Sequence, residues 1–325
     1  MKGADTRRPR CAGKVACVEI NVLIEAATRG DARALGRLCS VVERGDAQAR
    51  ILTAKLYAFG GKAWTTGITG APGAGKSTLT SGLVEEALVE GERVAVLAVD
   101  PSSSLSGGAI LGDRIRMGAH AGNEHVFIRS LANRGHLGGI SIAIPAMAAC
   151  LDGLGFPEVL IETVGVGQAE VEIASSADTT VVLVTAGWGD AVQAAKAGLL
   201  EVADIFVVNK ADRGGADATS RDIESMLDVG PVLDWRPPVL QTVASKGSGV
   251  AEVWKAVREH RAYLEAGDER ARQRRRRAAH DLGSALRANL AHSLNTEEPA
   301  SDLLDAIVTR RTDPWSAADR LLQAR

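Results

Sequence analysis

The chain has 325 residues, 46% hydrophobic and 24% charged, with a formal net charge of −2. This composition predicts a globular protein with a sizeable core, and the near-neutral charge argues against nucleic acid or an anionic membrane as a general partner. No apolar run approaches the roughly 20 residues of a transmembrane helix, and the four scattered cysteines fit the free thiols of a cytoplasmic protein better than a structural zinc site.

The N-terminal part, residues 1–60, predicts a helical extension that begins with a charged, irregular stretch over residues 1–15. Gly30-Asp31 and Gly45-Asp46 separate its helical patterns, because glycine ends a helix and aspartate caps the next one. The helices are expected over residues 18–28, 32–42 and 47–58.

The middle part, residues 61–250, alternates apolar runs with amphipathic segments, which predicts a doubly wound, mainly parallel α/β sheet. Ligands of such sheets bind at the carboxyl ends of the strands. Strands are expected over residues 64–69, 93–99, 126–128, 159–164, 180–185, 205–208 and 239–243. Helices are expected over residues 78–89, 139–151, 191–201 and 219–227.

The last part, residues 251–325, predicts a helical C-terminal extension. Its arginine run, Arg270–Arg277, is typical of a solvated or partner-facing helix face, because no aromatic residues alternate with the arginines as nucleic-acid binding would require. Helices are expected over residues 249–264, 268–290, 301–307 and 316–322.

The residues from Gly70 to Ser77, G-A-P-G-A-G-K-S, match the phosphate-loop pattern G-x-x-x-x-G-K-[ST] between an expected strand and an expected helix. In this motif backbone N–H groups cradle phosphates, the lysine reaches the β- and γ-phosphates, and the hydroxyl ligates Mg²⁺. The phosphate-binding residues predicted here are Gly70, Ala71, Pro72, Gly73, Ala74, Gly75, Lys76, Ser77 and Thr78.

Asn209-Lys210-Ala211-Asp212 follows a strand and has the N-K-x-D pattern that reads guanine. The Asp212 carboxylate can accept hydrogen bonds from the ring N1–H and the exocyclic amine of guanine, which adenine lacks at these positions. Losing such charge-assisted bonds costs about 1.5–3 kcal/mol each, so the motif predicts GTP rather than ATP. The Lys210 stem can lie along the face of the base.

A loop after the last expected strand occupies the usual place of a backbone segment that closes over the guanine. Its position, more than its composition, indicates this role. The predicted residues of the loop are Ala244, Ser245, Lys246 and Gly247.

Glu162 lies at the end of another expected strand, where an acid holds Mg²⁺ through water. The Gly165 N–H is placed to sense the γ-phosphate. Ras-like GTPases have glutamine directly after this glycine, whereas this chain has Val166, and Gln168 follows only later. We therefore expect slow intrinsic hydrolysis that a partner can stimulate.

Two further segments carry acids at expected strand ends. Asp100 is a candidate for Mg²⁺ contact, and Asp113 can act as a switch acid, a helix cap or an ion-pair partner of Arg116. Asp190 follows a glycine-rich loop, with Lys196 in the expected helix beyond it, and both are candidate switch residues.

Taken together, these motifs resemble the methylmalonyl-CoA mutase-associated GTPases, the MeaB/ArgK family. The resemblance implies a homodimeric GTPase that acts as chaperone for a coenzyme-B12-dependent acyl-CoA mutase, gating cofactor loading and protecting the mutase. It also implies that Lys76, Ser77, Asp100, Asp113 and Glu162 contact phosphate or Mg²⁺. The matching stretches are ITGAPGAGKSTL, VLAVDPSSSLSGGAILGDRIRM, SLANRGHLGG, IETVGVGQAE, GDAVQAAKAGLLEVADIFVVNKAD and TVASKGSGV.

Two other functions stay open. One is a kinase tied to transport of basic amino acids such as arginine and ornithine, although no acceptor-side base stands out. The other is a metal-delivery GTPase, whose relatives typically carry Cys/His clusters that this sequence lacks. The third glycine-rich loop, A-G-W-G-D-A-V, also departs from the family's usual Pro-Gly pattern, which leaves the identity of the partner mutase open.

Overall fold

The computed structural model describes residues 14–101, 118–120, 122–133, 139–163, 176–186, 202–230, 234–296 and 298–323. The chain forms two compact units, residues 1–274 and residues 275–325. Each unit is described by itself.

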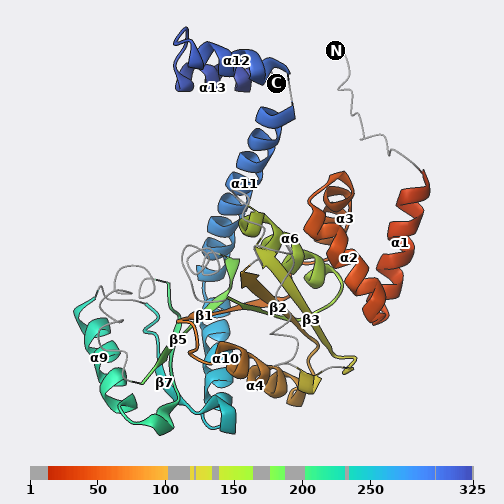
Figure 1. The fold of residues 1–325 in the computed structure, drawn as a ribbon. Coiled ribbons are helices and arrows are strands. Elements are labelled where there is room, and N and C mark those ends of the chain that lie inside the picture. The colour runs from red at the N-terminus through yellow and green to blue at the C-terminus, as the bar shows by residue number, and fades with distance from the viewer. Residues whose placement is uncertain are drawn as a thin grey trace. The chain divides into compact units, whose positions relative to one another are not determined.

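The first unit is built on a seven-stranded parallel sheet with the order β3-β2-β4-β1-β5-β6-β7 (Figure 1). The strands are β1 (Trp64–Gly70), β2 (Val94–Pro101), β3 (Val126–Asn133), β4 (Glu158–Glu162), β5 (Thr179–Thr185), β6 (Ile205–Asn209) and β7 (Val239–Thr242). β1 lies between β4 and β5 in the sheet. The doubly wound parallel architecture expected from the sequence is therefore confirmed.

Helices cover both faces of this sheet (Figure 1). They are α1 (Lys14–Thr28), α2 (Ala32–Arg44), α3 (Ala47–Tyr57), α4 (Lys76–Val89), α6 (Gly139–Gly153), α9 (Ala216–Val229), α10 (Val250–Ala266) and the beginning of α11 (Glu269–Thr296). The expected caps are present, because the Asp31 carboxylate accepts from the N–H groups of Arg33 and Ala34, and Asp46 accepts from Ala49. The helix expected over residues 191–201 lies outside the described residues.

The strands are buried on both faces, which explains their nearly continuous apolar sequences. In β2, Ala95 and Leu97 pack in one hydrophobic cluster with α6 and the N-terminal helices. The alternate residues Val94 and Val96 pack in a second cluster with α4 and α10. A third cluster joins β5 and β6 to α9.

The N-terminal helices share the main core. Leu38 of α2 and Leu52 and Leu56 of α3 are almost fully buried in the same cluster as Met147 and Leu151 of α6. Helices α1, α2 and α3 therefore pack in one unit with the sheet, and the division into an extension, a GTPase domain and a C-terminal extension stays a prediction.

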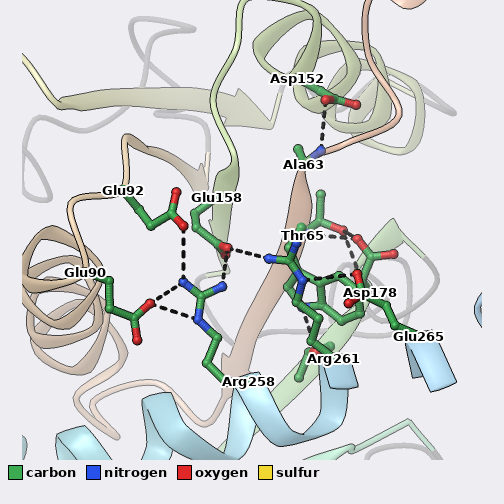
Figure 2. Close-up of polar contacts among 12 residues, drawn as sticks. Ala63, Thr65, Glu90, Glu92, Asp152, Glu158, Asp178, Arg258, Arg261 and Glu265 are labelled. Atoms are coloured by element: carbon green, nitrogen blue, oxygen red, sulfur yellow. Dashed lines mark hydrogen bonds and ion pairs between the residues drawn. The ribbon is translucent and has the colours of Figure 1, made fainter. Parts of the chain in front are cut away.

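An ion-pair network holds α10 at the amino ends of the strands (Figure 2). The Glu158 carboxylate at the start of β4 is fully buried and accepts from Arg258 Nη1 at 2.6 Å and Arg261 Nη1 at 3.0 Å. Arg258 also pairs with Glu90, just beyond α4. Burial raises the pKa of Glu158 to about 7, against the opposing effect of the two arginines.

The second unit contains the remainder of α11, α12 (Glu298–Val308) and α13 (Pro314–Gln323). Asp313 caps α13 by accepting from the backbone N–H groups of Trp315 and Ser316. Among the described residues of the whole chain, no helix is both long enough and apolar enough to cross a membrane.

Candidate functional site

The phosphate-loop sequence forms the turn between β1 and α4, as expected. Gly70 has φ 134°, and a Cβ there would lie 2.0 Å from the Leu183 carbonyl oxygen of β5. Gly75 has φ 97°, and a Cβ there would lie 2.3 Å from Asn209 Nδ2. No larger residue fits either position, because the backbone conformation and the neighbouring atoms both exclude a side chain.

The Lys76 side chain folds back over this loop. Its Nζ donates to the carbonyl oxygens of Gly70 at 2.7 Å and Ala71 at 2.9 Å, and the side chain is buried. Gly75, the N-cap of α4, makes no side-chain capping bond, so the helix N-terminus can face an anion. The lysine charge and the helix N-terminus together favour bound phosphate at this loop.

Ser77 and Glu162 meet beneath the loop. The Ser77 hydroxyl donates to Glu162 Oε1 at 2.5 Å, and both side chains are buried. The contact follows from sheet register, since Glu162 of β4 lies opposite Ile68 of β1. A hydroxyl and a carboxylate are the hard oxygen donors that Mg²⁺ prefers, so this pair fits the ion that the sequence predicts.

Asp100 lies near the same edge of the sheet. It occupies the penultimate position of β2, two residues beyond Ala98, which pairs with Glu162. Its backbone is thus placed at the carboxyl end of the strand, as expected. Five other predicted residues lie outside the described part of the chain: Asp113, Gly165, Gln168, Asp190 and Lys196.

Asn209, at the end of β6, links three parts of the site. Its Nδ2 donates to the Ala74 carbonyl oxygen at 2.7 Å. Its Oδ1 accepts from the Thr242 hydroxyl at 3.0 Å and from the Ala244 N–H at 3.1 Å. The side chain is 2% exposed. It therefore joins the phosphate loop to the loop after β7, a structural role that sequence reasoning missed although it had singled out the residue.

Lys210 adds a second link to the phosphate loop. It has φ 60°, in the left-handed region, and its Nζ donates to the Gly73 carbonyl oxygen at 2.6 Å. A non-glycine residue in this conformation is uncommon and costs free energy that the surrounding contacts must offset. The N-K-x-D segment is thus fixed against the phosphate loop at two points, through Asn209 and through Lys210.

Asp212 faces the loop after β7. Lys246 Nζ donates to Asp212 Oδ2 at 3.0 Å, and the pKa of this carboxyl is lowered, chiefly by that hydrogen bond. Both side chains are exposed, so the charged carboxylate is accessible to a ligand. The sequence predicted a closing backbone segment at residues 244–247, but it gave no sign that the Lys246 side chain would pair with Asp212.

The site as a whole gathers at the carboxyl ends of β1, β4 and β6. The phosphate loop, the Ser77–Glu162 pair and the Asn209–Asp212 segment come from separate parts of the sequence, and the sheet brings them together as expected. This arrangement can hold a nucleotide with its phosphates at α4 and its base between Asp212 and the 244–247 loop.

Comparison with known proteins gives consistent matches. The family model described as methylmalonyl-CoA mutase-associated GTPase MeaB matches residues 32–298. A Pyrococcus horikoshii protein assigned as a GTPase is 44% identical over 309 residues, which cover 94% of this chain and 98% of that protein. The mouse mitochondrial methylmalonic aciduria type A homolog is 33% identical over 268 residues, 79% of this chain and 64% of that protein. The crystal structure of a protein named LAO/AO transport system kinase has a TM-score of 0.71 at 27% identity, covering 94% of this chain and 97% of that one.

Proposed function

Because this chain belongs to the family of methylmalonyl-CoA mutase-associated GTPases described by MeaB, we propose that it couples GTP hydrolysis to cofactor loading and protection of a coenzyme-B12-dependent acyl-CoA mutase. That the chain is a GTP hydrolase follows from its family and from the GTPases it resembles over nearly its whole length. The mutase is proposed from the family description, and the contacts of the site support the nucleotide-dependent part of the proposal.

We assign the residues of the site the following roles. Lys76 and the backbone of the phosphate loop bind the β- and γ-phosphates. Ser77 and Glu162 hold Mg²⁺, with Asp100 as a further candidate near the same edge of the sheet, and the ion would neutralise charge that develops on the phosphates. Asp212 reads the guanine edge. The observation that carries this assignment is Asn209, which ties the phosphate loop to the end of β7 and the loop after it through three hydrogen bonds.

We propose that the intrinsic hydrolysis rate is slow. Val166 occupies the position at which Ras-like proteins have the glutamine that orients the attacking water. The switch roles of Gly165, Gln168, Asp190 and Lys196 belong to this proposal. A purified protein that turned over GTP on the order of 1 s⁻¹ or faster without a partner would contradict it.

Mutase binding is tested by co-purification in defined nucleotide states. The full chain is immobilised and loaded with Mg²⁺ and either GDP or a non-hydrolysable GTP analogue, and a coenzyme-B12-dependent acyl-CoA mutase from the same organism is passed over it. We expect retention that differs between the two states, and loss of that difference in Lys76→Ala, which cannot bind phosphate normally. Equal retention in both states, or no retention in either, would refute the chaperone proposal.

A second candidate function is a kinase linked to basic amino-acid transport, favoured by the name of the crystallised protein that this chain resembles, LAO/AO transport system kinase. It predicts transfer of the γ-phosphoryl group of GTP to an amino-acid-binding protein. Incubation with γ-labelled GTP and such a protein distinguishes the two, because a GTPase releases the label as free phosphate. The metal-delivery alternative is tested by titrating the protein with nickel or zinc. Tight binding of either metal would favour metal delivery over the mutase role.

We propose a homodimer formed through the helical C-terminal extension in the cytoplasm. In the second unit, Val308 and Trp315 are strongly exposed apolar side chains, which supports an interface there. Sedimentation of the full chain, with Trp315→Glu as the variant, would separate a dimer from a monomer.

A further inference from the structure

A cavity of about 580 Å³ lies between α1, α2, α3 and β3, apart from the residues of the candidate nucleotide site. Its volume falls within the range of small-molecule pockets, roughly 300–1,000 Å³. Neither the family assignment nor the mutase proposal gives this cavity a role. We call it the arginine groove, since its lining includes Arg33, Arg37, Arg44 and Arg129.

The arginines of α2 share one face of the helix. Arg33 and Arg37 are four residues apart, and Arg44 follows two turns later, so their side chains lie along one stripe. Like charges four residues apart destabilise a helix. Such an arrangement is therefore unfavourable for the helix alone, and a bound anion would relieve it.

The carboxylates near the groove are already engaged. Glu43 pairs with Arg129, and Asp46 pairs with Arg44 at 2.9 Å. Asp31 accepts two backbone hydrogen bonds as the cap of α2, and the positive charges of Arg33 and Arg37 further lower its pKa. Within the described part of the chain, Arg33 and Arg37 have no ion-pair partner. Two guanidinium groups thus remain to receive an anion.

Arg129 adds a donor on the inner wall. It lies in β3, its side chain is 21% exposed, and its guanidinium contacts Ser40 Oγ and Glu43. Its Nε is buried and finds no hydrogen-bond partner among the described residues. A buried donor of this kind is usually satisfied by a protein group, water or ligand.

Part of the remaining lining is apolar, beside the polar side chains of Ser40 and Gln48. Ile20 and Leu23 of α1 and Val41 of α2 line the groove together with Gly36. A Cβ at Gly36 would meet no atom within 4 Å, so this glycine in the middle of a helix leaves space rather than avoiding a clash. Glycine inside a helix is less favourable than alanine, and here it leaves open space in the groove.

From these observations we propose that the arginine groove binds a free organic anion, with a phosphate or carboxylate head held by Arg33, Arg37 and Arg129 and an apolar part packed against Ile20, Leu23 and Val41. The planar guanidinium groups suit bidentate binding of phosphate and carboxylate. The proposal stands independently of the mutase role, because it concerns a different surface of the chain.

The test uses the full chain loaded with Mg²⁺ and GDP, so that the phosphate loop is occupied. Hexyl phosphate is the probe, with inorganic phosphate and hexanol as half-probes, and binding is measured by titration calorimetry. We expect one saturable site with a Kd on the order of 0.1–1 mM for hexyl phosphate and much weaker binding of either half-probe.

Three variants locate the site. The double variant Arg33→Gln/Arg37→Gln removes the two guanidinium groups that would hold the anion, and it should weaken binding of hexyl phosphate by about tenfold or more. Gly36→Leu should fill the groove and abolish binding without unfolding the helix, because space is open at that position. Arg50→Gln is the matched control, since Arg50 is an exposed arginine of α3 outside the lining, and it should bind as the wild type does.

Three outcomes would overturn the proposal. The first is absence of saturable binding to the folded, GDP-loaded protein. The second is an equal loss of affinity in Arg50→Gln and in the double variant, which would indicate general charge attraction. The third is co-sedimentation with phosphatidic acid vesicles that depends on Arg33 and Arg37, which would make a lipid headgroup, rather than a free anion, the ligand.

Discussion

Replacing Asn209 by alanine should destabilise the protein and weaken nucleotide binding together. The substitution removes one donor to the Ala74 carbonyl and one acceptor shared by the Thr242 hydroxyl and the Ala244 N–H. Ala74, Thr242 and Ala244 are all buried, with exposed fractions of 0%, 1% and 8%. Their polar groups would therefore lose a protein partner in a place that water reaches poorly.

The magnitude follows from these three contacts. A buried polar group without a partner costs about 1–3 kcal/mol. Three such groups, with partial relaxation and some penetration of water into the space, should lower the free energy of unfolding by about 3–5 kcal/mol. That is a large share of the roughly 5–15 kcal/mol by which a typical domain is stable.

Two assays separate the effects on the fold and on the ligand. Urea denaturation of the nucleotide-free protein gives the free energy of unfolding, and a fluorescent GDP analogue gives the nucleotide affinity. Thr242→Val is the matched control, since it removes only one of the three hydrogen bonds and should cost about 1 kcal/mol. We expect Asn209→Ala to weaken GDP binding more than Thr242→Val does, because Asn209 hydrogen-bonds to the phosphate loop and the Thr242 hydroxyl bonds to Asn209 instead.

Asn209→Asp offers a second control of nearly equal size. It keeps the acceptor for Thr242 and Ala244 but places a carboxylate oxygen against the Ala74 carbonyl, so it should also loosen the phosphate loop. If Asn209→Ala lowered stability by no more than Thr242→Val, or left GDP affinity unchanged, the proposed link between the two loops would be refuted.

Three further predictions concern base selection and the amino ends of the strands. Asp212→Asn should reduce the preference for GTP over ATP by about tenfold or more, as measured by competition binding, and an unchanged preference would argue against its guanine contact. Glu158→Gln should lower the free energy of unfolding by about 1–3 kcal/mol, because it removes the carboxylate that Arg258 and Arg261 share, although each keeps an ion pair to another glutamate. Burial raises the pKa of Asp204 from 3.8 to about 7, so the folded state takes up the proton more readily and this group favours folding increasingly as pH falls from 8 towards 5. The side chain is 27% exposed, so solvent weakens the effect. Between pH 8 and pH 5 we expect the free energy of unfolding of the wild type to rise by about 1–2 kcal/mol relative to that of Asp204→Asn, as measured by urea denaturation. A relative fall over the same interval would contradict this prediction.

Local patterns predicted much of the fold. Apolar runs indicated the strands, and short motifs indicated the phosphate loop, Glu162 and the N-K-x-D segment, because turn geometry and ligand chemistry require particular residues at fixed spacing. The ends of elements were less well predicted. β3 runs on to Asn133 rather than ending at residue 128, because hydrogen bonds to β2 continue through Pro101.

Long-range contacts were the part that the sequence did not indicate. Nothing near Glu158 in the chain predicts that a residue of an apolar strand lies against Arg258 and Arg261, a hundred or more positions away. The same holds for Lys246 and Asp212. Such pairs depend on strand order and helix docking, which a local pattern does not determine.

The central position of β1 has a consequence for how the protein is made. Thr66 of β1 pairs with Thr179 of β5, and Gly70 is packed against Leu183. A ribosome adding about 5–20 residues per second needs several seconds or more to synthesise the intervening chain. The phosphate loop therefore leaves the ribosome well before the strand that supports it, and a nascent chain cannot acquire its nucleotide until most of the sheet has been synthesised. Truncated nascent chains that end before β5 should accordingly fail to retain GDP.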